Sequence, residues 1–224
     1  MTQRVSEIHF TQFCQDLGFS TAKIPRTNRR TADFVITTGT IRIIAEIKEI
    51  SGGPSAIAAL EEFALNRSIS LSSKPGKQAA NFIKDASGQI ASSARNEPTL
   101  VVLYSNISRP NLPAIMYDEH VGPDDIDAAM YGPLTVFVQP GRPSFNGPCY
   151  NIPINGESLA SRHRHISAIA VLSSYTHKNL AIYHNLYARV PLECTAFNGH
   201  GISHYFKTPS EGKLIRGWRK ERQL

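Results

Sequence analysis

The 224-residue chain has few cysteines and no apolar run long enough to cross a bilayer. Its three cysteines, Cys14, Cys149 and Cys194, are widely spaced and form no Cys-x-x-Cys pair. This spacing argues against a disulfide framework and against a zinc knuckle, and it is typical of a reducing compartment. The longest strongly apolar runs, 41–47 and 166–172, have only the length of strands. We therefore expect a protein with no membrane partner.

Signatures of other protein classes are also missing. The amino terminus lacks the basic and then apolar pattern of a secretion signal, so we expect a cytoplasmic protein. Residues 51–54 (SGGP) lack the Gly-Lys-Ser/Thr ending of a phosphate-binding loop, and residues 212–214 (GKL) lack the hydroxyl that follows the lysine there. No Gly-x-Ser-x-Gly nucleophile elbow occurs.

The formal net charge of +6 is unevenly distributed along the chain. Residues 1–156 contain 14 basic and 14 acidic side chains, whereas residues 157–224 contain 10 basic and 4 acidic ones. A basic segment of this kind suits a polyanion such as nucleic acid. A solvated tail is an equally good interpretation of the last basic stretch, 213–222.

The pattern of apolar residues predicts alternating helices and strands. A first helix is expected over 7–17, with Ser6 as its N-cap and Gly18 just after its end. Helical segments should follow at 55–65 and at 76–95, the second interrupted near Gly88, with a short helix at 124–130. Strands are expected at 20–24, 32–38, 41–48, 99–104, 134–139, 166–172 and 180–186, the last two forming a hairpin.

This order predicts a single α/β domain over residues 1–224. Helix, three strands, helices and strand in succession favour a mixed central sheet flanked by helices. The core would cover about residues 5–104, and residues 105–224 would add a β-rich C-terminal elaboration.

The most informative residues lie in the predicted hairpin 32–48. If residues 39–40 form a two-residue turn, the numbers of facing residues sum to 79, and Asp33 lies opposite Glu46. Their Cβ atoms would then be roughly 5 Å apart. Lys48 follows two residues after Glu46 and shares their face of the sheet. Two carboxylates and an ammonium on one face are what a divalent cation and an attacking water require.

The spacing of these three residues resembles the PD-(D/E)xK nuclease superfamily, which has the restriction-endonuclease-like fold. The resemblance covers roughly residues 5–104 and implies an α-β-β-β-α-β core. It implies that Asp33 and Glu46 ligate Mg²⁺, with Mn²⁺ as a substitute, and that the carbonyl of Ile47 is a further ligand. Lys48 would position the attacking water, and Glu7 of the first helix would support the site. These roles agree with the preference of Mg²⁺ for one or two carboxylates plus waters and phosphate oxygens.

The chain departs from the pattern of that superfamily in two places. Ala32 stands where the eponymous proline is expected. The Gln-x-x-x-Tyr motif of RecB-like members is absent, because Gln78 is followed by Phe82 and Gln89 by Ser93. The subfamily therefore stays open.

Basic residues near the hairpin are candidates for contact with nucleic acid. Arg26, Arg29 and Arg30 precede Asp33 closely and could hold phosphates beside the scissile bond. Lys77 and Gln78 could approach the same cleft, although an ordinary surface position is the stronger interpretation for these two.

Six of the eight histidines lie between His163 and His204. His163 and His165 form a His-x-His pair, and His200 and His204 a His-x-x-x-His pair, both of which occur in zinc sites. His184 and Asn185 resemble a fragment of an HNH nuclease, but no companion zinc frame is evident. We expect basic or aromatic surface positions rather than metal ligands.

The sequence thus predicts a Mg²⁺-dependent nuclease that acts on DNA more readily than on RNA. A homodimer is compatible with it, because cutting both strands usually needs two active sites. One alternative is a non-catalytic nucleic-acid-binding or assembly protein that retains the fold. Another is an unrelated α/β protein in which the hairpin charges are only surface features.

Overall fold

The computed structural model describes residues 4–25, 30–50, 76–106, 122–136, 149–153, 157–173, 179–199, 201–209, 215–216 and 218–220. The described helices are α1 (Val5–Asp16), α3 (Lys77–Ser93), α4 (Pro123–Tyr131), α5 (Leu159–Arg162) and the 3₁₀ turn η3 (Cys194–Ala196). The described strands are β1 (Ser20–Lys23), β2 (Phe34–Thr38), β3 (Ile41–Ile50), β4 (Thr99–Ser105), β5 (Leu134–Val136), β6 (Cys149–Asn151), β7 (Ala168–Ser173), β8 (Leu180–His184), β9 (Ile202–Phe206), β10 (Ile215–Arg216) and β11 (Arg219–Lys220).

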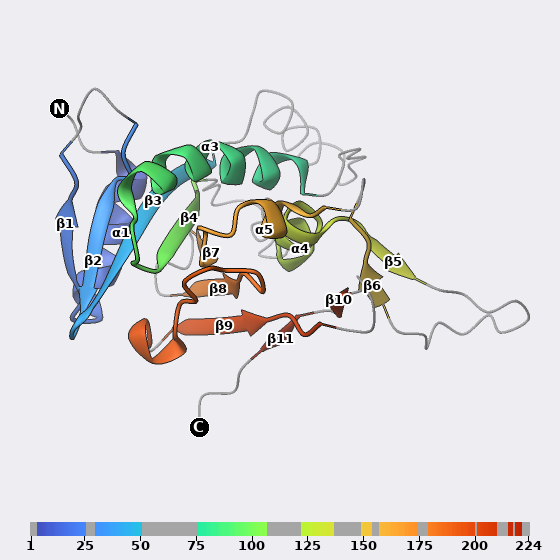
Figure 1. Cartoon of the computed structure of the whole chain (residues 1–224). Helices are drawn as coiled ribbons and strands as arrows, with labels where there is room; N and C mark the ends of the chain where they lie inside the picture. Colours follow the sequence, from blue (N-terminus) through green and yellow to red (C-terminus); the bar gives the residue numbers. More distant parts are fainter. Residues whose placement is uncertain are drawn as a thin grey trace, which may run out of the picture.

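A mixed sheet of eight strands forms the centre of the fold, in the order β1-β2-β3-β4-β7-β8-β9-β11 (Figure 1). The strands β1, β2 and β3 form an antiparallel meander, and β4 then pairs in parallel with both β3 and β7. A second sheet, β10-β6-β5, lies beside the first among the described residues. The predicted α/β class with a mixed, helix-flanked sheet is confirmed.

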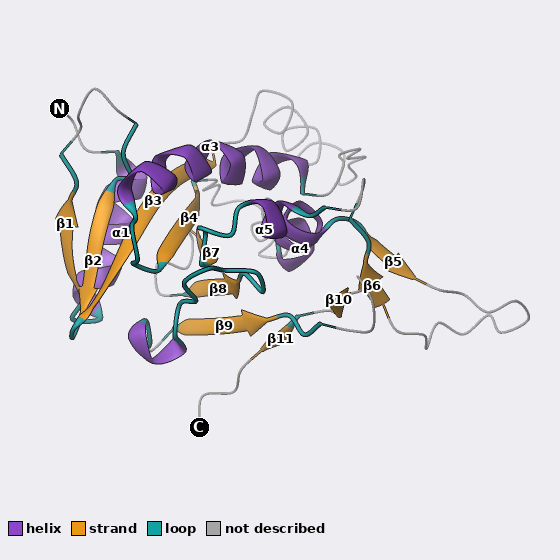
Figure 2. Ribbon diagram, in the orientation of Figure 1, coloured by secondary structure: helices purple, strands orange, loops and turns teal. Residues whose placement is uncertain are grey.

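The helices cover both faces of the large sheet (Figure 2). On one face, Phe10, Phe13 and Cys14 of α1 pack against Ile43, Ala45 and Ile47 of β3. On the other face, α3 and α4 pack against Ile44, Val101 and Ile169 through a cluster that includes Ile83, Ile90 and Ile126. Successive residues of β3 therefore point into two different cores, which the alternation of side chains along a strand requires. We call these the α1 face and the α3 face.

Several predicted boundaries differ from the observed ones. The first helix begins at Val5, so Ser6 lies inside it as a buried residue instead of capping it, whereas Gly18 adopts the expected left-handed conformation with φ of 76°. The helix α3 runs through Gly88 without interruption. The expected hairpin of β7 and β8 is confirmed as an antiparallel pair. The predicted helix 55–65 and the end of the strand 134–139 lie outside the described residues.

Among the helices that the structure describes, none combines the length and the apolar character that crossing a membrane requires.

Candidate active site

The hairpin of β2 and β3 has the register that the sequence predicts. Thr38 pairs with Ile41 and Phe34 with Ala45, so the numbers of paired residues sum to 79. Gly39 opens the two-residue turn with φ of 56°, a value that glycine adopts without steric cost. Asp33 comes one residue before β2, and its backbone N–H donates to the carbonyl of Ala45 at 3.1 Å, so the strand bulges at this residue. The predicted register is therefore observed from Phe34 to Thr38, and the regular ladder ends just before Asp33.

Asp33, Glu46 and Lys48 share the α3 face of the sheet and are largely buried. They are 6%, 1% and 9% exposed, respectively. Asp33 Oδ2 accepts a hydrogen bond from the Ile47 backbone N–H at 3.0 Å, which ties the carboxylate to the middle of the Glu46-Ile47-Lys48 segment. The β2–β3 ladder ends at the pair Phe34–Ala45, and the carbonyl of Ile47 points to the same side as its N–H. This carbonyl therefore faces the region where β2 has already ended.

The ammonium of Lys48 is held by three oxygens. Its Nζ lies 2.9 Å from Glu46 Oε1, 2.5 Å from Asp85 Oδ2 and 2.6 Å from Gln89 Oε1. Asp85 and Gln89 are four residues apart on α3, so both side chains project from one side of that helix toward β3. The hydrogen bond from Lys48 holds the pKa of Asp85 below its usual range. Sequence reasoning had assigned no role to either residue, although their i, i+4 spacing was a usable signal.

Glu46 carries the strongest electrostatic perturbation of the site. Its burial, and next the negative charge of Asp33, raise the pKa of Glu46 from 4.5 to about 7, although Lys48 acts in the opposite direction. Glu46 Oε1 faces Lys48, while Oε2 is buried and has no hydrogen-bond partner among the described residues. An unpartnered carboxylate oxygen beside a second carboxylate is the donor set that a hard divalent cation prefers. Asp33 and Glu46 therefore fit the metal that the resemblance implies.

Glu7 lies on the other face of the sheet. Its helix α1 packs on the α1 face, and Glu7 Oε2 binds Lys23 Nζ of β1 at 2.5 Å. The structure shows no contact between Glu7 and the three hairpin residues among the described side chains. A supporting role for Glu7 in the site stays a prediction.

The other basic candidates are placed at different distances from the site. Arg30 is exposed and binds Asp85 Oδ1 at 3.2 Å, so it joins the network around Lys48. Arg26 and Arg29 lie outside the described residues. Lys77 and Gln78 are exposed in the first turn of α3. Since each helical residue advances about 1.5 Å, they begin roughly 12 Å from Asp85 along the helix axis.

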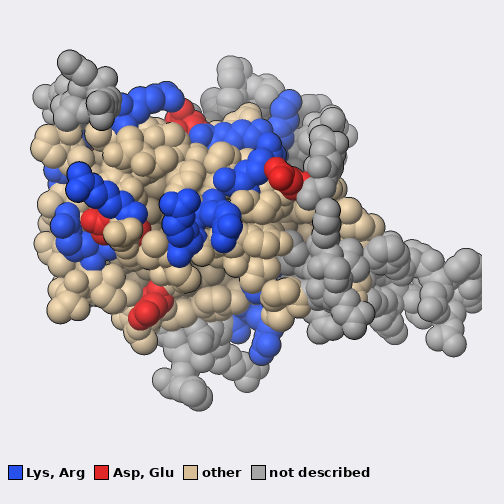
Figure 3. All heavy atoms as spheres, in the orientation of Figure 1, with Lys and Arg blue, Asp and Glu red and all other residues tan. Residues whose placement is uncertain are grey.

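Beside α3, four exposed basic residues surround two histidines and form a basic patch. Charges of Arg162 and Lys84 act on His163, and that of Arg189 acts on His165. The pKa of each histidine is lowered by burial first, and that of His163 next by the charge of His165; the positive charges of the arginines and of Lys84 act in the same direction. In Figure 3, Lys and Arg gather over the middle of the displayed face, with few Asp and Glu among them. The basic patch consists of Lys84, Arg162, Arg164 and Arg189.

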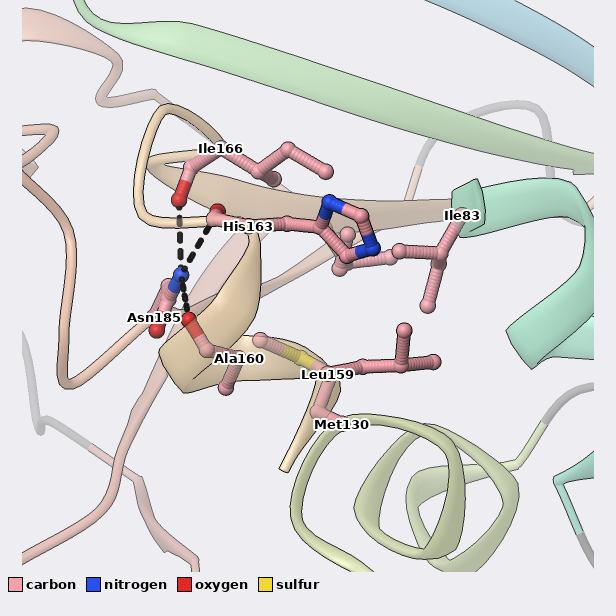
Figure 4. A pocket seen from close by; sticks show the side chains of 8 residues that line it. Ile83, Met130, Leu159, Ala160, His163, Ile166 and Asn185 are labelled. Carbon is pink, nitrogen blue, oxygen red and sulfur yellow. Dashed lines mark hydrogen bonds between the residues drawn. The ribbon is translucent and has the colours of Figure 1, made fainter. Parts of the chain in front are cut away.

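A small pocket on the α3 face is separate from the carboxylates. In Figure 4 the amide of Asn185 points away from the apolar lining and donates hydrogen bonds to backbone carbonyls, those of Ile166 at 2.9 Å and Ala160 at 3.1 Å among them. No carboxylate is among its lining residues, and His163 is the titratable group there. Its lining residues are Ile83, Met130, Leu159, Ala160, His163, Ile166, Ile169 and Asn185.

The four described histidines of the C-terminal half are not the surface residues that the sequence predicted. His184 and His204 are 7% and 2% exposed and face one another, with His184 Nε2 and His204 Nδ1 2.8 Å apart. His163 and His165 are half-buried and both hydrogen-bond Ser87 Oγ. His200 lies outside the described residues.

Comparison of the chain with protein-family models, with curated proteins and with solved structures gave no match.

Proposed function

We propose that the protein is a metal-dependent phosphodiesterase that cleaves nucleic acid, DNA in the first place, at the site formed by Asp33, Glu46 and Lys48. The observation that carries the proposal is the buried carboxylate of Glu46. One of its oxygens faces Lys48, the other has no partner among the described residues, and the carboxylate of Asp33 lies close enough to raise its pKa. Burial of such a group costs free energy unless a ligand of opposite charge compensates it.

In this proposal Asp33, Glu46 and the carbonyl of Ile47 would hold Mg²⁺. A bound Mg²⁺ supplies Lewis acidity toward a phosphate oxygen and lowers the pKa of water. Lys48 stabilises negative charge that develops on the phosphate, and this effect is strong because the ammonium is largely withdrawn from water. Asp85 and Gln89 keep the ammonium in place. The basic patch supplies electrostatic attraction for the phosphate backbone.

The order α1-β1-β2-β3-α3-β4 supports the further proposal that residues 5–104 form a restriction-endonuclease-like core. In this arrangement the meander presents the carboxylates, and α3 covers the face on which they lie. Coupling of Lys48 to α3 gives that helix a direct part in the site.

A second candidate is a non-catalytic nucleic-acid-binding protein. The observation in its favour is the engagement of Lys48 by Glu46, Asp85 and Gln89, because a saturated ion network of this kind also serves as a structural element. In that case nucleic acid would bind through the basic patch alone.

The two functions are separated by assaying the purified chain on plasmid, single-stranded DNA and RNA with Mg²⁺ or Mn²⁺. The nuclease proposal expects cleavage that is lost in chelator and in Asp33→Asn, Glu46→Gln and Lys48→Ala. The matched controls Arg4→Ala and Asp16→Asn, which change exposed residues at the two ends of α1, should cleave normally.

The binding protein is supported instead if no substrate is cut while salt-sensitive binding is seen. That binding should be unchanged in Asp33→Asn and weakened in Arg164→Glu, which reverses a charge of the basic patch.

A further inference from the structure

We propose that His184, Cys194 and His204 form a zinc site that fastens the crossover between β8 and β9 to the sheet. The ligand atoms of these three residues all lie within 4.8 Å of one another. Tetrahedral zinc, with bonds of about 2.0–2.1 Å to nitrogen and about 2.3 Å to sulfur, needs ligand atoms roughly 3.3–3.7 Å apart. The observed atoms therefore need to move by about 1 Å or less for all three to reach one ion.

The two imidazoles are already oriented as metal ligands are. His204 Nε2 donates to the carbonyl of Phe197 at 2.8 Å, so its Nδ1 carries the lone pair that faces His184. His184 also hydrogen-bonds to the backbone of Leu192, which leaves its Nε2 to face His204. A metal-binding histidine commonly donates its second ring N–H to a backbone carbonyl in this way.

The number of N–H groups on the rings of His184 and His204 favours a cation between them. The contacts Leu192–His184, His184–His204 and His204–Phe197 form a chain of three polar contacts between two backbone carbonyls. Two neutral imidazoles carry only two N–H groups, so one of the three contacts lacks a proton. A third proton would place an imidazolium among the buried rings of His184, His204 and Phe206. A bound cation compensates both lone pairs at once.

The chemistry of the donors selects zinc rather than the magnesium of the proposed active site. Thiolate and imidazole are borderline-soft ligands that suit Zn²⁺, whereas Mg²⁺ prefers oxygen. The site also lies on the α1 face. Leu180 and Ile182 alternate with their neighbours along β8 so that they share a face with His184, and both pack in the same hydrophobic core as α1. The strands β3 and β8 are three positions apart in the sheet, roughly 14 Å. The zinc would thus be independent of the proposed nuclease function, and a water would complete the tetrahedron that three protein ligands leave open.

The site joins segments that are distant along the chain. His184 ends β8, Cys194 begins the turn η3 within the crossover, and His204 lies in β9. The strands β8 and β9 are parallel, so the crossover between them cannot be a tight turn. A metal that links its middle to both strands would restrict the crossover.

The test measures the metal content of the full chain after expression with zinc and removal of loosely bound ions. We expect one zinc per chain in the wild type, and zinc affinity reduced more than about 100-fold in Cys194→Ser and His204→Gln. That estimate follows because loss of a mere supporting hydrogen bond already weakens metal binding about 10- to 100-fold. The controls Cys14→Ala, at the buried free cysteine of α1, and Asp33→Asn should retain zinc.

Because Cys194→Ser could destabilise the fold, a cobalt titration of the metal-free wild type provides a second measurement. One equivalent of Co²⁺ should produce the thiolate-to-cobalt charge-transfer band and tetrahedral visible bands, and Zn²⁺ should displace it. The proposal is overturned if the wild type binds no stoichiometric zinc and shows no thiolate band. It is equally overturned if zinc persists in a folded Cys194→Ser variant, or is lost in Asp33→Asn alone.

Discussion

Lys48 Nζ lies 2.9 Å from Glu46 Oε1, so the ammonium of Lys48 neutralises only one oxygen of the carboxylate two residues earlier on the same strand. Glu46 Oε2 has no partner among the described residues. With Asp33 and Asp85 the site contains three carboxylates, against the two cations Lys48 and Arg30. The site therefore has an excess of negative charge that a divalent cation would compensate.

The first prediction concerns pH. The pKa of Glu46 in the folded protein is about 7, above its ordinary value of 4.5, so the folded state holds this proton more tightly than the unfolded chain does. The resulting stability is fully present below pH 4.5 and is lost as the pH rises through 7. In chelator, the free energy of unfolding of the wild type should therefore fall by about 3 kcal/mol relative to that of Glu46→Gln as the pH rises from below 4.5 to above 7. This figure follows because each pKa unit corresponds to about 1.36 kcal/mol. Urea unfolding of both proteins at several pH values tests this, and parallel stability curves would contradict it.

The second prediction concerns metal. At pH 8, where Glu46 is ionised, Mg²⁺ should stabilise the wild type because it binds the folded site and not the unfolded chain. At a Mg²⁺ concentration of about 100 times Kd, the free energy of unfolding should rise by about 2.7 kcal/mol. Thermal melts with and without Mg²⁺ measure the effect, which Asp33→Asn and Glu46→Gln should abolish. An equal shift in wild type and both variants would show that Mg²⁺ binds elsewhere.

The third prediction concerns Gln89, whose side-chain oxygen binds Lys48 Nζ at 2.6 Å. Hydrogen bonds to charged groups contribute about 1.5–3 kcal/mol, so Gln89→Ala should reduce kcat about 10- to 100-fold and leave KM largely unchanged. The matched control is Gln15→Ala, which changes an exposed glutamine of α1. Equal activity of the two variants would show that Gln89 does not position Lys48.

Sequence patterns predict the structure well where it depends on residues that are close together along the chain. The alternation of residues 32–48 and the glycine at position 39 are sufficient to define the register of the hairpin, because strand periodicity and turn length together determine which residues face each other. The predicted start of α1 is wrong, because Ser6 is buried within the helix and does not cap it.

Contacts between distant segments could not be predicted from these patterns. Asp85 and Gln89 are about 40 residues from Lys48, and nothing in their own neighbourhood indicates which strand α3 will cover. The pairing of His184 with His204 similarly depends on β8 and β9 becoming parallel neighbours. Such contacts arise from the packing of whole elements, which single-sequence periodicity does not determine.

The fourth prediction concerns the buried ion pair of Lys207 and Asp127. Both residues are 5% exposed, and Lys207 Nζ also binds Asn151 Oδ1 at 2.6 Å. Lys207→Ala would leave the carboxylate of Asp127 buried without its cation, which typically costs 3–5 kcal/mol. Equilibrium unfolding in urea measures the loss. The control Lys220→Ala, at an exposed lysine of β11, should change stability by less than about 0.5 kcal/mol. A loss below about 1 kcal/mol in Lys207→Ala would indicate that Asp127 takes up a proton instead.

The fifth prediction contrasts two glycines, neither of which has an atom within 4 Å of where a Cβ would lie. Gly88 is an exposed residue inside α3, so Gly88→Ala should stabilise the protein by about 0.5–1 kcal/mol through the higher helix propensity of alanine. Gly39 has φ of 56° in the turn of the hairpin, so Gly39→Ala should destabilise it by about 1–2 kcal/mol. Chemical denaturation of both variants measures these changes. Because space is open at both positions, only backbone conformation distinguishes them. Changes of stability of the same sign would contradict the turn geometry that sets the register of β2 and β3.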